Sequence, residues 1–417
     1  MLKSKKKLLL IGYNFSPEPT GIGKYSGEMI EWLANQGHEC VVVTTYPYYP
    51  YWKVQEPYYK KRFLYMKEIK NFESGGKITV YRCPMYVPKE PSGKKRIILD
   101  LSFMVSAFLQ LIKLLFYKKC DWVITVVPSF QFGLLGYFYK IFKKSKTVYH
   151  IQDMQIEAAQ DLNMIKSKSI LNVLFKVERF IFKKSDIISS ISEKMVLKIE
   201  EKAKKGVILF PNWSDTDFFK PLDNREALKA EFGFSSNDKI VLYSGAIGEK
   251  QGLEAIVYAA EKFNNETNIK FIICGTGPYK EKLQSLVKSL HLVNVQFFPL
   301  QPMEKFNQFL NMADVHLVIQ KAKASDLVMP SKLTTILSVG GLALITANED
   351  SGLYALTKKY NMGLLVKAEN QEALNTGISE ALTTSQRLSI MQNARQYAQN
   401  YLDINNVMKT FENSLFN

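Results

Sequence analysis

A glycine-bearing loop followed by a helix start carries the strongest chemical signal in this sequence. Residues 240–252, IVLYSGAIGEKQG, are typical of a short β-branched strand, a loop that holds Gly245 and Lys250, and a helix that begins near Leu253. Such a loop aims backbone N–H groups and the positive end of a helix at one point, which suits a phosphate group. Lys250 would add a full positive charge to that point.

A second lysine lies at a similar junction about eighty residues later. Residues 326–332, DLVMPSK, place Lys332 directly after Pro330 and Ser331, which are typical first residues of a helix. Two cationic helix starts that face one crevice would bind a diphosphate. We therefore predict a ligand that contains a diphosphate.

The first loop, residues 14–22 with the sequence NFSPEPTGI, brings Gly21 to the start of a helix. Its glycines form GxGxxxG rather than the dinucleotide fingerprint, and the second strand ends in Thr44 and Thr45 where an acidic ribose ligand is expected. These departures exclude NAD. Close approach of a ligand at Gly21 and simple packing of a helix on a sheet are equally compatible with this segment.

The sequence YHIQD places His150 and Asp153 at the end of an apolar run. In open α/β sheets this carboxyl edge binds ligands. Asp153 could orient the imidazole or hold a sugar hydroxyl, whereas a buried structural histidine is the competing interpretation.

Short apolar runs alternate with helical patterns along the chain and must position these residues. The alternation restarts near residue 240, which predicts two parallel sheets with crossover helices. A length of 417 residues also indicates two domains. No glycine- or serine-rich linker interrupts the pattern, so we expect a tight hinge near residues 211–219.

The charge is distributed unevenly between the two halves. Residues 1–200 hold 32 Lys and Arg against 17 Asp and Glu (+15), while residues 201–417 hold 23 against 22 (+1). The front half is therefore expected to meet an anionic surface or ligand. Four widely spaced cysteines and the absence of a secretion signal predict a reduced, cytoplasmic chain without a bound metal.

Taken together, the motifs resemble a known family, the retaining GT-B glycosyltransferases grouped as family four, particularly its colanic-acid and O-antigen type members. The resemblance spans nearly the whole chain and rests on six segments in the family's order, which are TGIGKY with WLANQGHECVVVT, YHIQD, LFPNWSD, YSGAIGEKQGLE, CGTGP and LVMPSKL. It implies two Rossmann-like domains that face a cleft. The expected boundaries are 1–214 for the acceptor domain and 215–395 for the nucleotide-sugar domain, with a helix of about residues 396–417 packing back on the first.

The resemblance also implies roles for single residues. Gly21 matches the glycine near the donor phosphate and sugar, His150 the histidine beside the donor sugar, and Lys250 the lysine on the pyrophosphate. Lys332 resembles the lysine of a PSKL turn. The nucleotide is expected to contact the loop formed by Gly275, Thr276 and Gly277, the backbone near Leu300, and the residues Gly245, Ser331, Asp326 and Thr335.

Two departures from the family pattern affect the predicted site. Ala246 stands where an arginine of the phosphate clamp is usual, and Leu327 and Thr335 occupy the positions of a glutamate pair spaced eight apart, with Asp326 one residue out of register. Loss of the second glutamate removes the usual acceptor for the ribose hydroxyls. The lysines and helix dipoles of the phosphate clamp are retained.

The implied reaction moves a sugar from a nucleotide diphosphate sugar to a lipid-linked or oligosaccharide acceptor of a bacterial capsule, exopolysaccharide or O-antigen, with retention of configuration. Catalysis would lie mainly in electrostatic stabilisation of the leaving diphosphate, with no protein nucleophile, metal or cofactor. UDP is favoured over GDP in the donor.

Two other classes of function share some of these features. A nucleotide-sugar epimerase of the same fold would need an acid and a base on both sugar faces, and only His150 is an evident candidate. A nucleic-acid-binding protein would explain the charge, but no RNA-binding signature occurs. The aromatic segment 46–59 is better interpreted as a mobile loop that offers sugar-stacking faces, or as a surface loop without such a role.

The charge and the apolar segment 101–116 also predict peripheral attachment to the anionic inner face of the plasma membrane. This segment of sixteen residues contains Lys113 and falls short of a membrane-spanning helix. Lysine-rich aromatic sequence at 137–146 would contribute further. In the competing interpretation, residues 101–116 form a crossover helix of the core and the charge only aids solubility.

Overall fold

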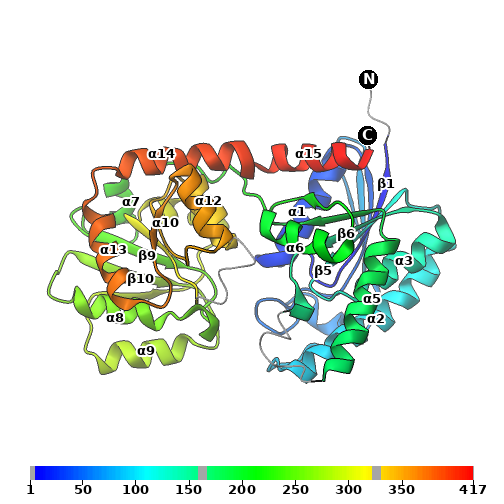
Figure 1. Ribbon diagram of the computed structural model, residues 1–417, viewed down its shortest axis with the longest axis horizontal. Coiled ribbons are helices and arrows are strands. Elements are labelled where there is room, and N and C mark those ends of the chain that lie inside the picture. The colour runs from blue at the N-terminus through cyan, green and yellow to red at the C-terminus, as the bar shows by residue number, and fades with distance from the viewer. Residues whose placement is uncertain (1–4, 158–166, 322–329, 417) are drawn as a thin grey trace. The chain divides into compact units, whose positions relative to one another are not determined.

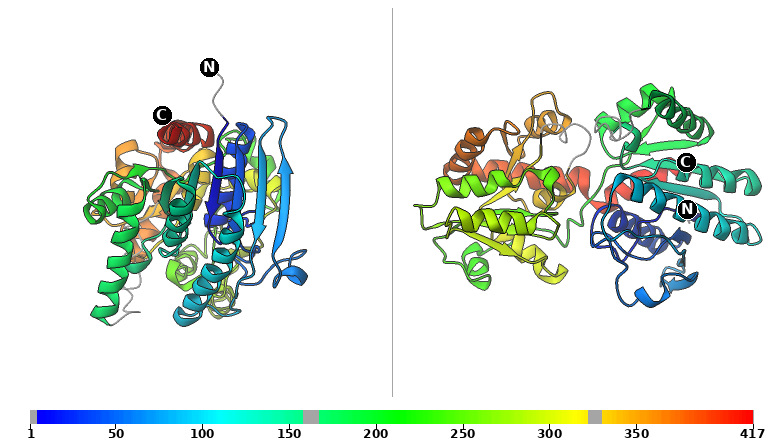
Figure 2. Two further views of the ribbon diagram at one scale, coloured as in Figure 1. Left: turned by 90° about the vertical axis from the view of Figure 1, so that its right-hand side faces the viewer. Right: turned by 90° about the horizontal axis from the view of Figure 1, so that it is seen from below.

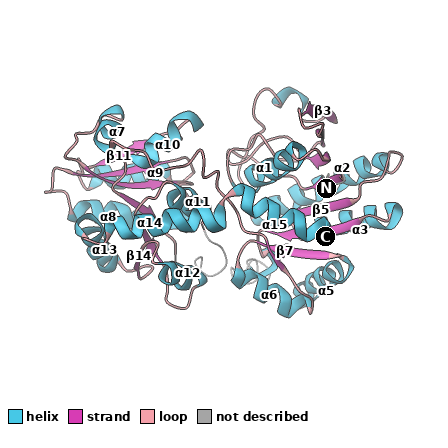
Figure 3. Cartoon of the chain, turned by 90° about the horizontal axis from the view of Figure 1, so that it is seen from above, coloured by secondary structure: helices cyan, strands magenta, loops and turns pink. Residues whose placement is uncertain are grey.

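The computed structural model describes residues 5–157, 167–321 and 330–416. The chain divides into two compact units, Met1–Phe210 and Pro211–Asn417, which are called here the N-terminal unit and the C-terminal unit (Figure 1). In each unit, helices cover a largely parallel sheet, as the alternation of apolar runs and helical patterns in the sequence predicts (Figure 3).

The N-terminal unit contains an eight-stranded sheet in the order β3-β4-β2-β1-β5-β6-β7-β8. All neighbouring strands are parallel except β3 and β4. The strands are β1 (Lys7–Ile11), β2 (Glu39–Thr44), β3 (Met66–Asn71), β4 (Lys77–Arg82), β5 (Trp122–Val127), β6 (Lys146–Ile151), β7 (Ile187–Ser190) and β8 (Ile208–Leu209). Every residue of β5, WVITVV, is buried, as expected for a central parallel strand covered on both faces.

The helices of the N-terminal unit connect these parallel strands across the faces of the sheet. Those that the structure describes are α1 (Gly21–Asn35), the 3₁₀ turn η1 (Tyr59–Lys61), α2 (Gly93–Leu114), α3 (Phe132–Lys143), α5 (Lys168–Lys184) and α6 (Glu193–Ala203). Ser92, Ser167 and Ser192 cap α2, α5 and α6 by accepting a backbone N–H bond, which fixes where each helix begins.

Strand β3 is absent from the pattern of apolar runs, and its sequence explains why. MKEIKN pairs antiparallel with β4 at the edge of the sheet, where most of its side chains are exposed. The light blue strands at one side of the sheet show this edge (Figure 2, left). Arg82 of β4 forms an ion pair with Glu68 of β3 at 2.9 Å, so the strand is held by polar contacts that hydrophobic periodicity does not reveal.

The C-terminal unit contains a six-stranded sheet in the order β11-β10-β9-β12-β13-β14, with all described pairs parallel. Its strands are β9 (Lys239–Ser244), β10 (Ile269–Cys274), β11 (Val295–Phe298), β12 (Val315–Val318), β13 (Ala343–Thr346) and β14 (Leu364–Val366). Ser244 lies beside Cys274, and Cys274 beside Phe298, so three strands end at one edge.

The described helices of the C-terminal unit are α7 (Arg225–Glu231), η2 (Glu249–Gln251), α8 (Glu254–Lys262), α9 (Lys280–Ser289), α10 (Met303–Asn311), α11 (Ser331–Ser338), α12 (Gly352–Tyr360), α13 (Gln371–Thr383), α14 (Arg387–Tyr397), the π turn η4 (Ala398–Leu402) and α15 (Ile404–Phe416). Residues of α7 to α14 supply the cores on the two faces of the sheet. The predicted packing of residues 396–417 on the acceptor domain stays a prediction.

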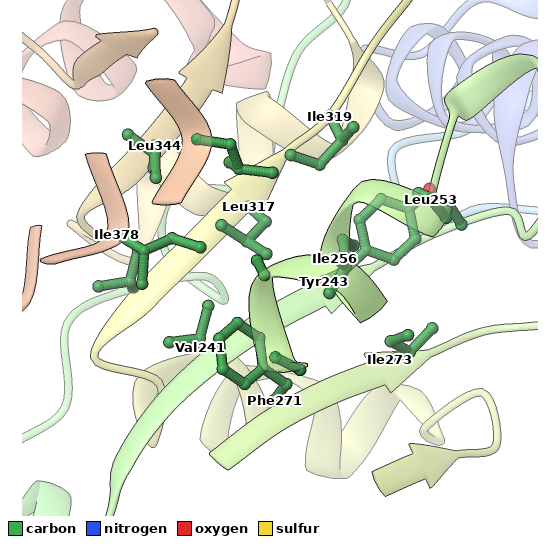
Figure 4. Packing of buried hydrophobic residues seen from close by; sticks show 14 of the residues in the cluster. Val241, Tyr243, Leu253, Ile256, Phe271, Ile273, Leu317, Ile319, Leu344 and Ile378 are labelled. Carbon is green, nitrogen blue, oxygen red and sulfur yellow. The ribbon is translucent and has the colours of Figure 1, made fainter. Parts of the chain in front are cut away.

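Alternate residues of β9 supply the cores on the two faces of this sheet. Val241 and Tyr243 belong to a cluster with residues of α8, α9 and α13 (Figure 4), whereas Ile240 and Leu242 pack against α7 and α10. Burial on both sides explains the continuous apolar run that ends at the glycine loop. The core therefore fixes the position of that loop.

Helix α2 is longer than the apolar segment suggested. It begins at Gly93 and reaches Leu114, and within the described residues it is the one helix whose length and composition would allow it to cross a membrane. Its buried residues, such as Phe103 and Ala107, contribute to the core of the N-terminal unit, and α2 contacts β2 and α3. These contacts are those of a crossover helix.

Candidate functional site

The two glycine loops of the C-terminal unit pack directly on each other after β9 and β10. Gly245 N donates to Cys274 O at 3.0 Å, and Ile247 N donates to Thr276 O at 2.9 Å. A Cβ atom on Gly275 would lie 1.9 Å from Gly245 O, and one on Gly277 would lie 2.1 Å from Ile247 O. Only glycine permits this approach, so the spacing seen in the sequence has a packing cause here.

Lys332, the second residue of α11, extends its side chain to the first of these loops. Its Nζ lies 3.7 Å from the centroid of the Tyr243 ring, and a Cβ atom on Gly245 would lie 3.0 Å from that nitrogen. Desolvation by burial lowers the pKa of Lys332 to about 7. The structure therefore brings together Gly245, Gly275, Thr276, Gly277 and Lys332 at the carboxyl edge of one sheet.

Other residues that were predicted to contact the sugar donor make local contacts within the C-terminal unit. Thr335 Oγ1 donates to Lys332 O at 2.9 Å within α11, so its hydroxyl is used inside the helix. Ser331 is exposed at the first position of α11. Leu300 is half-buried directly after Pro299, whose carbonyl oxygen accepts from Cys274 Sγ at 3.1 Å.

Two predicted residues are described only in part or not at all. The backbone of Lys250 lies in the 3₁₀ turn η2, three residues before Leu253, which occupies the N-cap position of α8. Asp326 lies outside the described residues. The roles of both in the site stay predictions.

In the N-terminal unit, His150 lies near the end of β6, paired with Val126 of β5 and Ser189 of β7. Its Nδ1 lies 3.0 Å from Ser189 Oγ, and its Nε2 lies 3.1 Å from Gln152 Nε2. The side chain is only 2% exposed, and burial lowers its pKa to about 3, so the imidazole is neutral at physiological pH. A donating Gln152 amide fits the tautomer that carries its proton on Nδ1.

The partners of His150 differ from the sequence-based expectation. Ser189 and Gln152, which the sequence did not indicate, lie at the two ring nitrogens of the imidazole. Asp153 follows β6 and is exposed, so a contact with a sugar hydroxyl stays a prediction. Gly21 is the first residue of α1 and has a φ of +61°, which favours glycine because of the backbone conformation alone.

Two buried carboxyl groups of the N-terminal unit were not predicted from the sequence. Glu18 accepts from Asn14 Nδ2 at 2.8 Å and from the backbone of Tyr48 and Tyr49, and burial raises its pKa to about 7. Burial raises the pKa of Asp100 in α2 to about 6. The available signal for Asp100 was an acidic residue inside the apolar sequence IILDLSF.

The aromatic segment 46–59 is partly buried and not wholly a surface loop, and its contact with a sugar stays a prediction. Tyr46 and Tyr48 are buried, and Tyr48 packs edge-on against Tyr13 with ring centroids 6.3 Å apart. Tyr51 is exposed and Trp52 is half-buried beneath the guanidinium of Arg96, 5.2 Å from the ring centroid. Residues 46–48 and Val54 of this segment are therefore part of the buried interior.

The side chains that could ligate a metal are dispersed in the part of the chain that the structure describes. No group of three or more His, Cys, Asp or Glu residues gathers there. The expectation that the reaction uses no resident metal stays a prediction.

Comparison with known proteins decides the family. Residues 20–213 match the model of the glycosyl transferase 4-like domain, and residues 224–400 match the glycosyl transferases group 1. A protein of Escherichia coli K12 named as a colanic acid biosynthesis glycosyl transferase, WcaI, is 41% identical over 98% of this chain and 99% of its own length. The chain belongs to this glycosyltransferase family. The resemblance predicted from the motifs is thus confirmed.

Solved structures confirm the GT-B fold of this glycosyltransferase. Sucrose-phosphate synthase of Thermosynechococcus elongatus gives a TM-score of 0.77 at 16% identity, covering 99% of this chain and 98% of that one. Anabaena HepE, in complex with UDP and glucose, gives 0.70 at 12% identity, covering 98% and 99%. Both likenesses support the fold class of two Rossmann-like parallel-sheet domains.

Proposed function

We propose that this glycosyltransferase moves a sugar from a nucleotide diphosphate sugar to a lipid-linked glycan during synthesis of a bacterial surface polysaccharide. The convergence of Lys332 with the two glycine loops at one sheet edge carries the proposal. The likeness to WcaI supports the polysaccharide pathway, and the UDP in the HepE structure supports UDP as the nucleotide.

The chemistry follows from the charge that develops as the donor breaks. The bond between C1 of the sugar and the β-phosphate oxygen breaks, which leaves an oxocarbenium-like sugar and a diphosphate. Lys332, Lys250 and the N-terminus of α11 would stabilise that anion more strongly than the intact donor. A phosphate oxygen takes the proton of the acceptor hydroxyl as the new C1–O bond forms on the same face, which retains the configuration.

In this proposal, the N-terminal unit binds the acceptor and contacts the sugar of the donor. Because His150 is neutral and both ring nitrogens contact side chains, it would act as a hydrogen-bonding group and not as an acid. Gln152 is half-buried and lies on the Nε2 side. Rotation of Gln152 would open Nε2 to a sugar hydroxyl while Ser189 continues to hold Nδ1.

The N-terminal unit also has a surface suited to an anionic membrane. Exposed apolar side chains lie along α2 and α3, which contact each other, and Phe116, two residues after the last residue of α2, is 86% exposed. They are Ile97, Ile98, Leu101, Val105, Leu109, Phe116, Ile141 and Phe142, which we call the α2–α3 ridge. Lys94, Lys95, Lys113 and Lys143 lie on the same helices.

Residues 59–65 extend this ridge. Tyr65 Oη donates to Ser106 O of α2 at 3.0 Å, and Lys113 Nζ lies 5.0 Å from the Tyr65 ring. Phe63 in this segment is 72% exposed. Apolar side chains among cations combine hydrophobic burial with about 1 kcal/mol for each lysine near anionic lipid, which suits an acceptor held in a membrane.

A panel of UDP-, GDP- and dTDP-sugars tests the proposal, with free nucleotide diphosphate as the readout. Slow release from one donor, accelerated by a bacterial lipid extract and accompanied by transfer of the sugar to lipid, is expected. Conversion of the donor sugar into its epimer without release of the nucleotide would contradict glycosyl transfer.

A further inference from the structure

The ring of Tyr243 lies directly against the ammonium group of Lys332. Lys332 Nζ lies 3.7 Å from the ring centroid, well within the range of a cation–π interaction. Tyr243 is fully buried in β9, near Leu253 and Ile256 in the core (Figure 4). Its hydroxyl donates to Ala246 O at 2.8 Å, so the ring is anchored to the same glycine loop that faces the lysine.

The surroundings of Lys332 otherwise disfavour a positive charge. Burial lowers its pKa, and the positive end of the α11 dipole lies at its own helical turn. Among the described residues, none of the ion pairs includes Lys332. Within the described residues, the aromatic face is therefore the neighbour of Lys332 that favours its charged form.

A ring and a carboxylate hold a lysine in different ways. A carboxylate would neutralise the ammonium and compete with any phosphate that approaches it. A π face attracts the cation through the ring quadrupole but leaves its net charge and its N–H donors available to an anion. The Tyr243 ring thus positions a cation without cancelling it.

We propose that Tyr243 is a positioning residue that holds Lys332 at the glycine loop, ready to bind the diphosphate of the donor. The inference rests on the proposed function, because it takes a nucleoside diphosphate as the ligand of this edge. It extends that function by explaining how a clamp that lacks the usual arginine, replaced here by Ala246, keeps Lys332 in place.

A double-mutant cycle tests this role. The affinity for UDP, or for the diphosphate of the donor identified by the panel, is measured by calorimetry for the wild type, Tyr243→Leu, Lys332→Ala and the double variant. Tyr243→Leu is expected to weaken diphosphate binding about tenfold, the scale of a desolvated cation–π contact. In the Lys332→Ala background, the same change should have almost no further effect. Additive losses would overturn the inference.

Fluorinated phenylalanines at position 243 provide a test that does not depend on the fold of the leucine variant. Phenylalanine itself keeps the ring and should bind the diphosphate within about twofold of the wild type. Each added fluorine weakens the π face at nearly constant size, so affinity should decline in steps. Affinity that is unaffected by fluorination would overturn the positioning role.

The outcomes distinguish a failure of the proposed function from a failure of the role of Tyr243. A wild type that binds no nucleoside diphosphate at all contradicts the proposed function. A wild type that binds one, together with additive or fluorine-independent losses, contradicts only the role of Tyr243. Binding of the free nucleoside should be equal in all variants, because it lacks the phosphates that Lys332 contacts.

Discussion

His150 Nδ1 lies 3.0 Å from Ser189 Oγ, across neighbouring parallel strands in which the two residues pair directly. The register of β6 and β7 therefore sets the orientation of the imidazole, and Gln152 contacts the opposite nitrogen. A histidine held on both sides and kept neutral by burial can position a hydroxyl, but it cannot serve as an imidazolium at neutral pH.

We expect His150→Ala to reduce sugar transfer about a hundredfold, the scale for one lost hydrogen bond in a transition state. Affinity for the nucleoside diphosphate should be almost unchanged, because His150 belongs to the N-terminal unit and the predicted clamp to the C-terminal unit. Transfer rates and calorimetry check this, with exposed His291→Ala as the control. An equal loss of nucleotide affinity would show that the histidine is structural.

The clamp lysines give a second prediction. Lys332→Ala and Lys250→Ala should each lower turnover by roughly two to three orders of magnitude, the usual effect of losing a preorganised contact to a developing anion. The melting temperature should change little for either variant. Lys288→Ala, an exposed lysine at the end of α9, is the matched control. Near-normal turnover in one variant would remove that lysine from the clamp.

The pKa of Lys332 near 7 predicts a pH dependence of diphosphate binding. Below pH 7 the amine of Lys332 is protonated and attracts the anion. Above pH 7 the amine of the free protein is mostly neutral, so it must take up a proton when the diphosphate binds. Affinity should therefore decrease more than tenfold between pH 7 and pH 9, where the phosphate is already fully ionised. Lys332→Arg keeps its charge throughout and should bind with a flatter profile. Equal slopes in both proteins would refute the assignment.

The α2–α3 ridge should mediate attachment to anionic membranes. Wild-type protein is expected to co-sediment with phosphatidylglycerol vesicles but not with neutral phosphatidylcholine vesicles, and added salt should weaken binding. Val105→Glu should lower the partition coefficient at least severalfold. Val293→Glu, which charges an 80% exposed valine of the C-terminal unit, should have no effect. Equal binding to both lipids, or to neither, would contradict membrane recognition.

Much of the fold could be predicted from the positions of apolar runs and glycines in the sequence. Central strands such as β5 and β9 are largely apolar, and Gly275 and Gly277 mark the loop after β10 because a Cβ atom on either would collide with backbone. Edge strand β3 could not be predicted in this way, since its polar side chains face solvent and its stability comes from pairing with β4.

The contacts within the candidate site were less predictable than its location. The sequence places Asp153 next to His150, but strand register brings Ser189 to the ring from 39 residues away. Tyr243 and Lys332 likewise meet only because α11 begins near the end of β9. Glu18 and Asp100 become notable only once burial is known, because their raised pKa values arise from desolvation.

Recognition of a diphosphate by the C-terminal unit is the central claim, and calorimetric titration tests it most directly. The protein is titrated with the diphosphate of the donor identified by the panel and with the corresponding monophosphate and nucleoside. We predict that the diphosphate binds at least tenfold more tightly than the monophosphate, and that Lys332→Ala removes most of this difference. Equal affinities for the diphosphate and the monophosphate would contradict the account.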